Sequence, residues 1–323
     1  MDPLLTYGVF FLTLVGIYAL LTLGLNVQWG FTGLFNIGIA AFFSVGAYTS
    51  VILTTPLTPR HLGGFDLPLA VGWTGAMVTA GILALLIGLI TLKLREDYLA
   101  IASIGIAEIV RLVLKNEEWL TNGVRGIGGM PRPFAFLGPG LRELATLALV
   151  LTLTAIVYLA LERARQSPWG RGLRAIRERE VSAMAAGKNV LAFRLQAFVI
   201  GSMVMGLSGA VYAHFIGFIS PEAFDPMYAT FLVWVMLIVG GSGNNRGALL
   251  GALVIWVVWS ATEYAANMLP ADLAARASAL RLLLVGVLLQ VILLSRPQGL
   301  LPEPREVNRA LARRPAETEK AGP

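Results

Sequence analysis

Glu108 is the acidic residue best placed to do chemistry inside an apolar stretch, and Arg111 follows it three positions later. At this spacing the two side chains share one face of a helix and can form an ion pair. Ionisable groups within a membrane are costly and commonly mark ion or proton pathways. A proton pathway usually needs more embedded acids than one. The pattern therefore favours a structural pair, or an Arg111 side chain that extends to the outer membrane surface.

Three uncharged amides, Asn26, Gln28 and Asn36, form a second candidate group within the glycine-rich stretch from Gly24 to Ser50. At membrane depth each amide must find a hydrogen-bond partner or line a wet cavity. The small residues around them allow helices to approach closely. A broken segment beside a translocation path and a tightly packed segment with locally bonded amides both fit this pattern. We take Asn26, Gln28, Asn36 and Glu108 as candidates for lining such a path.

The sequence offers little for metal or redox chemistry. It has no cysteine, which removes disulfides, cysteine-based zinc sites and iron–sulfur clusters. The histidines, His61 and His214, lie far apart, so we predict no metal site. A P-loop pattern for binding phosphates is also missing from the sequence. We therefore predict no catalytic residue and no cofactor bound by this chain.

A basic loop between two apolar stretches is the strongest indication of a partner. The stretch from Leu161 to Leu195 carries eight of the 25 basic residues. Within it we predict one short helix from about Arg171 to Ala186, which Gly187 ends as a left-handed cap. Contact with anionic lipid headgroups fits this composition. Composition alone favours this lipid contact, whereas a helical loop that also carries small residues suggests the docking of a soluble protein.

Long apolar helices must position all of these residues. The chain is 56% hydrophobic and 14% charged, with a mean hydropathy of +0.73, whereas soluble domains have about 25% charged residues. Its continuous apolar stretches match transmembrane helices rather than the alternating strands of a barrel. We predict an all-α polytopic integral membrane protein with about nine (eight to ten) transmembrane helices. The predicted spans are Leu4–Leu25, Leu34–Thr54, Leu67–Leu92, Tyr98–Leu114, Leu144–Leu161, Leu195–Phe215, Met227–Val239, Ala248–Ala265 and Leu280–Leu294.

The charge distribution sets the orientation. The net charge of +6 fits cytoplasmic loops rich in Lys and Arg, so we expect no nucleic-acid partner. With the N-terminus outside, 17 basic residues lie in cytoplasmic segments and seven lie outside. The first apolar stretch lacks the features of a removable signal peptide. We predict a membrane domain over residues 1–295, a cytoplasmic loop at about 162–194, and a disordered cytoplasmic tail over 296–323.

Taken together, several segments resemble the permease subunits of bacterial branched-chain amino-acid ABC importers, LivM type. The resemblance runs from about Leu20 to Leu300, nearly the whole chain. Its most specific parts are GLNVQWGFTGLFNIGIAAFFSVGAYTS, LREDYLAIASIGIAEIVRLVLKN, SPWGRGLRAIREREVSAMAAGKNV, GFISPEAF, VGGSGNNRGALLGA and RPQGLL. Leu34, Asn36 and Ile39 depart from the polar Gln, Ser and His that the family commonly has there. This departure leaves the substrate open, because related permeases serve urea and short amides.

The resemblance implies a multi-pass subunit of the bacterial inner membrane. Its partners would be a second permease, two cytoplasmic ATPases that use ATP, and an extracytoplasmic substrate-binding protein. In such importers a cytoplasmic helix fits a groove on the ATPase. The resemblance assigns this coupling role to Glu178, Glu180, Ala183, Ala186 and Gly187.

Two other classes of transport protein remain to be weighed. A gradient-driven secondary transporter would need buried acids or broken helices at matching positions of two repeats, and Glu108 is one embedded acid without a convincing internal repeat around it. A channel would need a selectivity filter of carbonyl or charged rings. The sequence favours the ABC permease over both.

Overall fold

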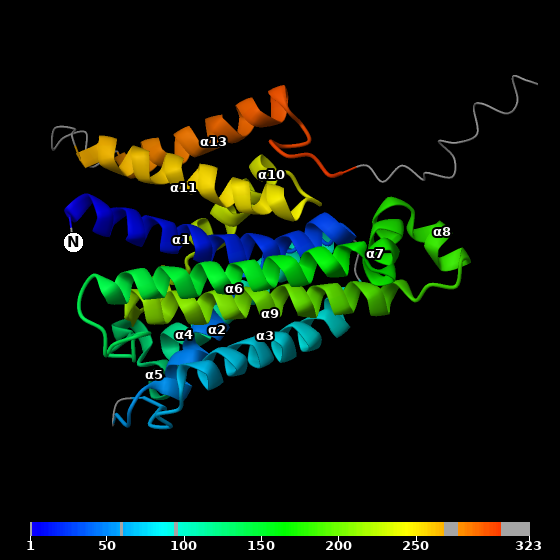
Figure 1. Cartoon of the computed structure of the whole chain (residues 1–323). Helices are drawn as coiled ribbons and strands as arrows, with labels where there is room; N and C mark the ends of the chain where they lie inside the picture. The colour runs from blue at the N-terminus through cyan, green and yellow to red at the C-terminus, as the bar shows by residue number, and fades with distance from the viewer. Residues whose placement is uncertain (1, 59–60, 94–95, 268–276, 305–323) are drawn as a thin grey trace, which may run out of the picture.

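The computed structural model describes residues 2–58, 61–93, 96–267 and 277–304. Long helices run side by side in one bundle, with the N-terminus at one end (Figure 1). Helices α7 (Pro168–Glu178) and α8 (Glu180–Ala185) lie at the opposite end. The helical class predicted from composition agrees with this arrangement.

Nine further helices form the bundle in the described part of the chain, and short elements connect them. The bundle helices are α1 (Pro3–Leu25), α2 (Ile39–Thr54), α3 (Leu69–Thr91), α4 (Glu96–Asn116), α6 (Leu141–Gln166), α9 (Val190–Ile216), α10 (Leu232–Gly240), α11 (Asn245–Asn267) and α13 (Ala277–Ser295). The short elements are the π-helices η1 (Asn26–Gly30) and η4 (Met227–Phe231), helix α5 (Glu118–Thr121), the 3-10 turns η2 (Gly123–Arg125) and η3 (Pro221–Phe224), and the strands β1 (Ile127–Gly128) and β2 (Phe218–Ile219).

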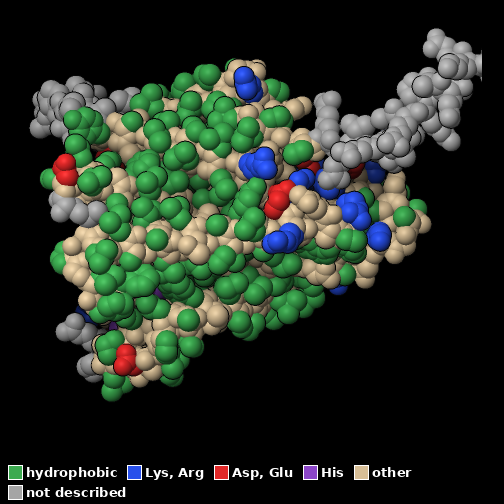
Figure 2. Space-filling view, in the orientation of Figure 1, with side chains coloured by type: hydrophobic (Ala, Val, Ile, Leu, Met, Phe, Trp, Pro, Cys, Tyr) green, Lys and Arg blue, Asp and Glu red, His purple; other side chains and the backbone are tan. Residues whose placement is uncertain are grey.

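The bundle has the apolar surface of a membrane protein. Among the described residues, five helices are long and apolar enough to cross a membrane, and three shorter helices are also apolar. The five are Pro3–Gly30, Leu69–Thr91, Leu141–Gln166, Val190–Ile216 and Asn245–Tyr264. Hydrophobic side chains cover much of the visible face, whereas Lys and Arg gather toward the end that carries α7 and α8 (Figure 2). A polytopic membrane fold follows, and the total of about nine crossings stays a prediction.

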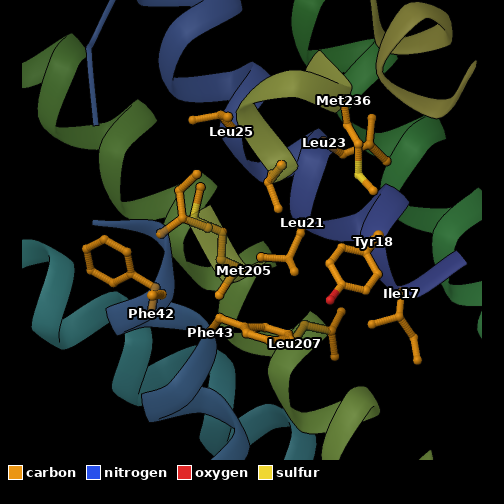
Figure 3. Close-up of a cluster of buried hydrophobic side chains, with 14 of the residues drawn as sticks. Ile17, Tyr18, Leu21, Leu23, Leu25, Phe42, Phe43, Met205, Leu207 and Met236 are labelled. Carbon is orange, nitrogen blue, oxygen red and sulfur yellow. The ribbon is translucent and has the colours of Figure 1, made fainter. Parts of the chain in front are cut away.

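Helices α2 and α9 pack backbone to backbone because glycine occupies their contact positions. A Cβ atom at Gly46 would overlap the backbone of Gly206, and one at Gly209 would overlap the carbonyl oxygen of Phe43. Around this contact lies a continuous apolar core in which side chains of α1, α2, α9 and α10 meet (Figure 3). Lipid provides no hydrophobic force between helices, so close packing of this kind holds the bundle together.

The first helix is interrupted within the glycine-rich stretch. Helix α1 continues into η1 and stops after Thr32, and residues 33–38 are non-helical before α2 begins at Ile39. Gly33 has a φ of +74°, a conformation that glycine adopts without steric cost. The span predicted to start at Leu34 therefore starts later, at Ile39. The segment is both broken and tightly packed, so the two interpretations of its sequence are compatible.

Short contacts join the loops at the end of the bundle opposite α7 and α8. Strand β1 pairs antiparallel with β2, with Ile127 opposite Ile219 and Gly128 opposite Phe218. The buried His214 of α9 lies with Nδ1 2.8 Å from the carbonyl oxygen of Pro131 and Nε2 2.8 Å from Ser50 Oγ. These bonds attach the loop around Pro131 to the bundle.

The segment after α13 differs at its beginning from the predicted disordered tail. The amides of Leu300 and Leu301 donate to the carbonyl oxygens of Val239 and Gly240, each at 2.9 Å. The prediction relied on proline and charge content, whereas both leucines make main-chain bonds and the side chain of Leu300 packs against the apolar core. Residues 296–304 thus belong to the folded part, and residues 305–323 of the predicted tail lie outside the described residues.

Candidate coupling surface and buried polar network

Helix α7 begins directly where α6 ends. Ser167 Oγ accepts a hydrogen bond from the Gly170 amide at 3.4 Å, and Pro168 occupies the first helical position, where no amide donor is needed. A Cβ atom at Gly170 would overlap the carbonyl oxygen of Arg165. The cap, the proline and this close approach together let the chain turn sharply from α6 into α7.

The loop contains two helices where the sequence predicted one from Arg171 to Ala186. Arg179, with φ −150° and ψ 88°, separates α7 from α8. On a continuous helix Ile176 and Ala183 would lie about 10 Å apart along the axis. The break instead lets both pack into one small apolar cluster with Val190. The burial of Ala183 therefore accounts for the change of chain direction between α7 and α8.

Gly187 ends α8 as the sequence predicted. Its φ is +76°, and its amide donates to the carbonyl oxygen of Met184 at 2.9 Å. The amide of Lys188 donates to the carbonyl oxygen of Ala183 at 3.1 Å. These two bonds make a complete Schellman motif, in which glycine takes the left-handed position.

The five residues assigned to coupling divide into two groups. Glu178, Ala186 and Gly187 are exposed, and no atom lies within 4 Å of a Cβ built at Gly187. Ala183, in contrast, is only 6% exposed and faces the interior of the loop. Glu180 pairs with Arg194 of α9 at 3.0 Å. The coupling role of all five residues stays a prediction: in this conformation Ala183 is buried within the loop and Glu180 pairs with α9, whereas the other three are exposed.

Two apolar residues that sequence analysis missed lie beside the exposed group. Val181 is 75% exposed and Met184 is 51% exposed. Exposed apolar residues that cluster on a charged segment mark interaction surfaces. The presence of Val181 and Met184 within this charged stretch of the sequence was the signal that could have identified them. We define the α8 tip as the exposed residues Val181, Met184, Ala185, Ala186 and Gly187.

Asn26 lies in η1 without solvent exposure and bonds to the start of α11. Its Nδ2 donates to Asn245 Oδ1 at 2.9 Å, and its Oδ1 accepts from the Gly243 amide at 2.8 Å. Asn245 Nδ2 in turn donates to Glu162 Oε2 of α6 at 2.9 Å. We call Asn26, Gly243, Asn245 and Glu162 the buried amide network. It connects the first helix to the helix that leads into α7.

Gln28 and Asn36 bond to each other and to α9. Asn36 Nδ2 donates to Gln28 Oε1 at 2.8 Å, while Gln28 Nε2 donates to the carbonyl oxygen of Phe198 at 2.9 Å and to Ser202 Oγ at 3.0 Å. Both amides are 0% exposed. In this conformation they are bonding groups of a packed interior, so lining a path is a prediction for a state in which these helices separate.

We expect Asn26→Leu, which keeps the branched shape of the side chain but removes its polar atoms, to destabilise the chain. The substitution leaves the Gly243 amide and Asn245 Oδ1 without their partner, and each buried unpaired group costs about 1–3 kcal/mol. The thermal midpoint of the purified chain in detergent, measured at a fixed scan rate, should fall. Thr152→Val is the control, because this exposed hydroxyl bonds only within its own helix. Equal midpoints for the two variants would contradict the buried amide network.

Glu108 and Arg111 form the pair that their spacing favoured. Arg111 Nε donates to Glu108 Oε2 at 2.9 Å, and Nη2 donates to Oε1 at 2.6 Å. This is the strong two-pronged geometry of arginine with a carboxylate. The side chains are 40% exposed for Glu108 and 24% for Arg111. The four residues proposed to line a path thus do not form one cluster. Three of them make buried hydrogen bonds, whereas Glu108 pairs with Arg111 on α4.

Known permease proteins are similar to this chain over most of its length. Residues 7–293 match the family described as branched-chain amino acid transport system/permease component. The chain is 30% identical over 316 residues to the high-affinity branched-chain amino acid transport system permease protein LivM of Escherichia coli (strain K12), covering 91% of this chain and 69% of that protein. No solved structure matches the chain.

Two further relatives extend the comparison. The probable branched-chain amino acid transport permease protein LivM of Methanocaldococcus jannaschii is 30% identical over 315 residues, which cover 89% of this chain and 91% of that protein. The corresponding permease protein LivH of Escherichia coli (strain K12) is 26% identical over 270 residues, covering 78% and 85%. The chain therefore belongs to the family of branched-chain amino acid transport system permease components.

Proposed function

We propose that this chain is a membrane permease subunit of an ABC importer for branched-chain amino acids and forms part of the translocation pathway. The observation that carries the proposal is the α8 tip, an exposed apolar surface on a helical loop at one end of an apolar bundle. A short helix of this kind suits a groove on a soluble protein. The family match over residues 7–293 supports the same role.

The relatives support a partnership between two kinds of permease chain. This chain resembles both the LivM and the LivH permease proteins of Escherichia coli, LivM more than LivH. We infer a second, different permease subunit, two cytoplasmic ATPases that use ATP, and an extracytoplasmic substrate-binding protein. Membrane lipid would surround the bundle. The names of the relatives favour branched-chain amino acids over urea or short amides.

The geometry suggests how ATP would drive the chain. Closure of the ATPase pair would displace the α8 tip, and α8 would carry α7 with it because Ala183 and Ile176 share one apolar cluster. Helix α7 follows α6 directly after the Ser167 cap, and Glu162 of α6 belongs to the buried amide network. A movement at the loop would therefore reach the interrupted first helix.

In the proposed orientation α7, α8 and the C-terminus are cytoplasmic and the N-terminus is outside, in a bacterial inner membrane. The N-terminus lies at the other end of the bundle from α7 and α8, which supports this arrangement (Figure 1). The gathering of Lys and Arg toward the α7 end also supports it (Figure 2).

We expect Glu108→Gln to leave ATP-driven leucine uptake within about twofold of wild type, because Glu108 accepts hydrogen bonds from Arg111 and the amide oxygen of glutamine can still accept one of them. Uptake by the reconstituted complex would be measured with and without a proton ionophore. Loss of uptake in the variant, together with sensitivity of the wild type to the ionophore, would favour the gradient-driven alternative.

Co-purification tests the proposed assembly. The chain would be extracted from its native membrane in a mild detergent, and the proteins that accompany it would be identified by mass spectrometry. We expect ATPase subunits and a second permease in fixed stoichiometry. A chain that is recovered alone, yet still takes up substrate in liposomes under an ion gradient, would overturn the proposal.

A further inference from the structure

Arg177 of α7 contacts two segments that lie far from it in the sequence. Its Nη1 donates to the carbonyl oxygen of Gly30, and its Nη2 pairs with Glu303 Oε2 at 2.6 Å. The side chains of Arg177 and Glu303 are 24% and 25% exposed. One guanidinium thus joins the loop helix, the end of the first helix and the segment after α13.

The Gly30 carbonyl is a favourable acceptor for a cation. It belongs to the last turn of the interrupted helix, which stops after Thr32. Carbonyl oxygens at a helix end lack intrahelical partners and carry partial negative charge. An arginine that caps this end satisfies one of them and adds a favourable interaction with the helix dipole.

Glu303 is held in place on the other side of the guanidinium. We define the C-terminal strap as residues 296–304, which the amides of Leu300 and Leu301 attach to the end of α10. Asn244 Nδ2 also donates to the carbonyl oxygen of Pro302 at 3.1 Å. The carboxylate of Glu303 therefore approaches Arg177 from a fixed backbone rather than from a free chain end.

The surroundings connect Arg177 to the buried amide network. A Cβ atom built at Gly243 would lie 3.1 Å from Arg177 Nη1, and the Gly243 amide donates to Asn26. A cavity of about 870 Å³ opens beside the pair, and its lining includes Trp29, Gly33 and Gln298 of the strap. This space gives the loop helix room to move relative to the first helix unless Arg177 holds them together.

We propose that Arg177 is a positioning residue of the transport cycle, which fastens α7 to both the end of the first helix and the C-terminal strap. A displacement of the α8 tip then moves all three segments as one unit. The inference rests on the proposed function and adds a specific residue contact through which the loop drives the membrane helices. Lysine cannot replace it fully, because an ammonium lacks the planar fork that reaches two acceptors at once.

The test is the ratio of leucine taken up to ATP hydrolysed by the full importer complex in proteoliposomes. Arg177→Ala should lower this ratio about fivefold or more, the scale of a typical coupling between sites. Arg177→Lys and Glu303→Gln should each lower it less. The double variant Arg177→Ala/Glu303→Gln should be no worse than Arg177→Ala, because both substitutions break the same contact. Arg246→Ala, at an exposed arginine near the same end of the bundle, is the matched control and should keep the ratio.

Several outcomes would overturn the inference. The first is that Arg177→Ala keeps the wild-type ratio of leucine uptake to ATP hydrolysis. The second is that uptake and hydrolysis fall in parallel in this variant, which would indicate a merely structural role. Losses that multiply in the double variant would also overturn it. If the importer complex does not assemble with Arg177→Ala, the Glu303→Gln variant provides the test. An unchanged ratio of leucine uptake to ATP hydrolysis in that variant would contradict the proposed role of the contact. A wild-type complex without ATP-dependent uptake would instead overturn the proposed function, and this inference with it.

Discussion

Gly187→Trp and Ala186→Trp are each expected to lower ATP-driven uptake by about 30-fold or more, since a clash at the centre of an interface costs at least about 2 kcal/mol. Both positions are exposed on the α8 tip. Space around Gly187 is open, with no atom within 4 Å of an added Cβ, so the isolated chain has room for the indole. The loss would therefore arise where the tip meets its partner.

The pair of variants separates docking from backbone strain. Gly187 has a φ of +76°, so tryptophan there also costs about 1–2 kcal/mol of local strain. Ala186 has a φ of −80° and carries no such cost. Gly187→Asn is the control, because asparagine tolerates the left-handed conformation and is small. Normal uptake by assembled complexes that contain Ala186→Trp would show that the tip does not dock.

Gly209→Leu is expected to prevent the chain from folding into a stable bundle. A side chain at this position would overlap the carbonyl oxygen of Phe43, and the nearby backbone nitrogen of Ala47 lies 3.0 Å from the Cβ position. Backbone atoms cannot move aside as a rotamer can, so the cost should reach or exceed about 3 kcal/mol. Aggregation in place of a single size-exclusion peak in mild detergent would be the observed effect.

Gly105→Leu is the matched control for this substitution. Gly105 lies on α4, and nothing lies within 4 Å of a Cβ built there. We expect this variant to give a single peak and a thermal midpoint close to that of wild type. A single peak and a wild-type thermal midpoint for Gly209→Leu would contradict the close packing of α2 against α9.

The fold class could be predicted from the sequence because its causes are local. A membrane-spanning helix satisfies its own backbone hydrogen bonds, so length and apolar composition nearly suffice to identify it. For the glycine-rich stretch an interruption was one of two interpretations that the sequence left open, and Gly33 takes part in it with a positive φ. The end of α8 at Gly187 was predictable for the same reason, since one residue type sets the cap.

The position of the break between α7 and α8 was not predictable in this way. Neither glycine nor proline stands at Arg179, and the residues on both sides favour a helix. The break accompanies a tertiary contact, in which Ala183 packs together with Ile176 and Val190. The same contact removed Ala183 from the outward-facing group.

The C-terminal strap was missed for a related reason. Proline and charge indicated disorder, but Leu300 and Leu301 bond to the end of α10, which lies about 60 residues earlier. The partners of Glu303 and Asn26 are still more distant in the sequence, at separations of 126 and 219 residues. Pairings of this kind depend on how the helices are arranged, and no local pattern encodes them.

The most direct test of the account is leucine uptake by proteoliposomes that contain this chain, its partner permease and the two ATPases, with the binding protein outside and ATP inside. We predict accumulation of radiolabelled leucine that requires both ATP and the binding protein and that persists when a proton ionophore is added. Omission of this chain should abolish uptake. Accumulation that proceeds without ATP, and that stops when the ion gradient is dissipated, would contradict the assignment of this chain as an ABC importer permease.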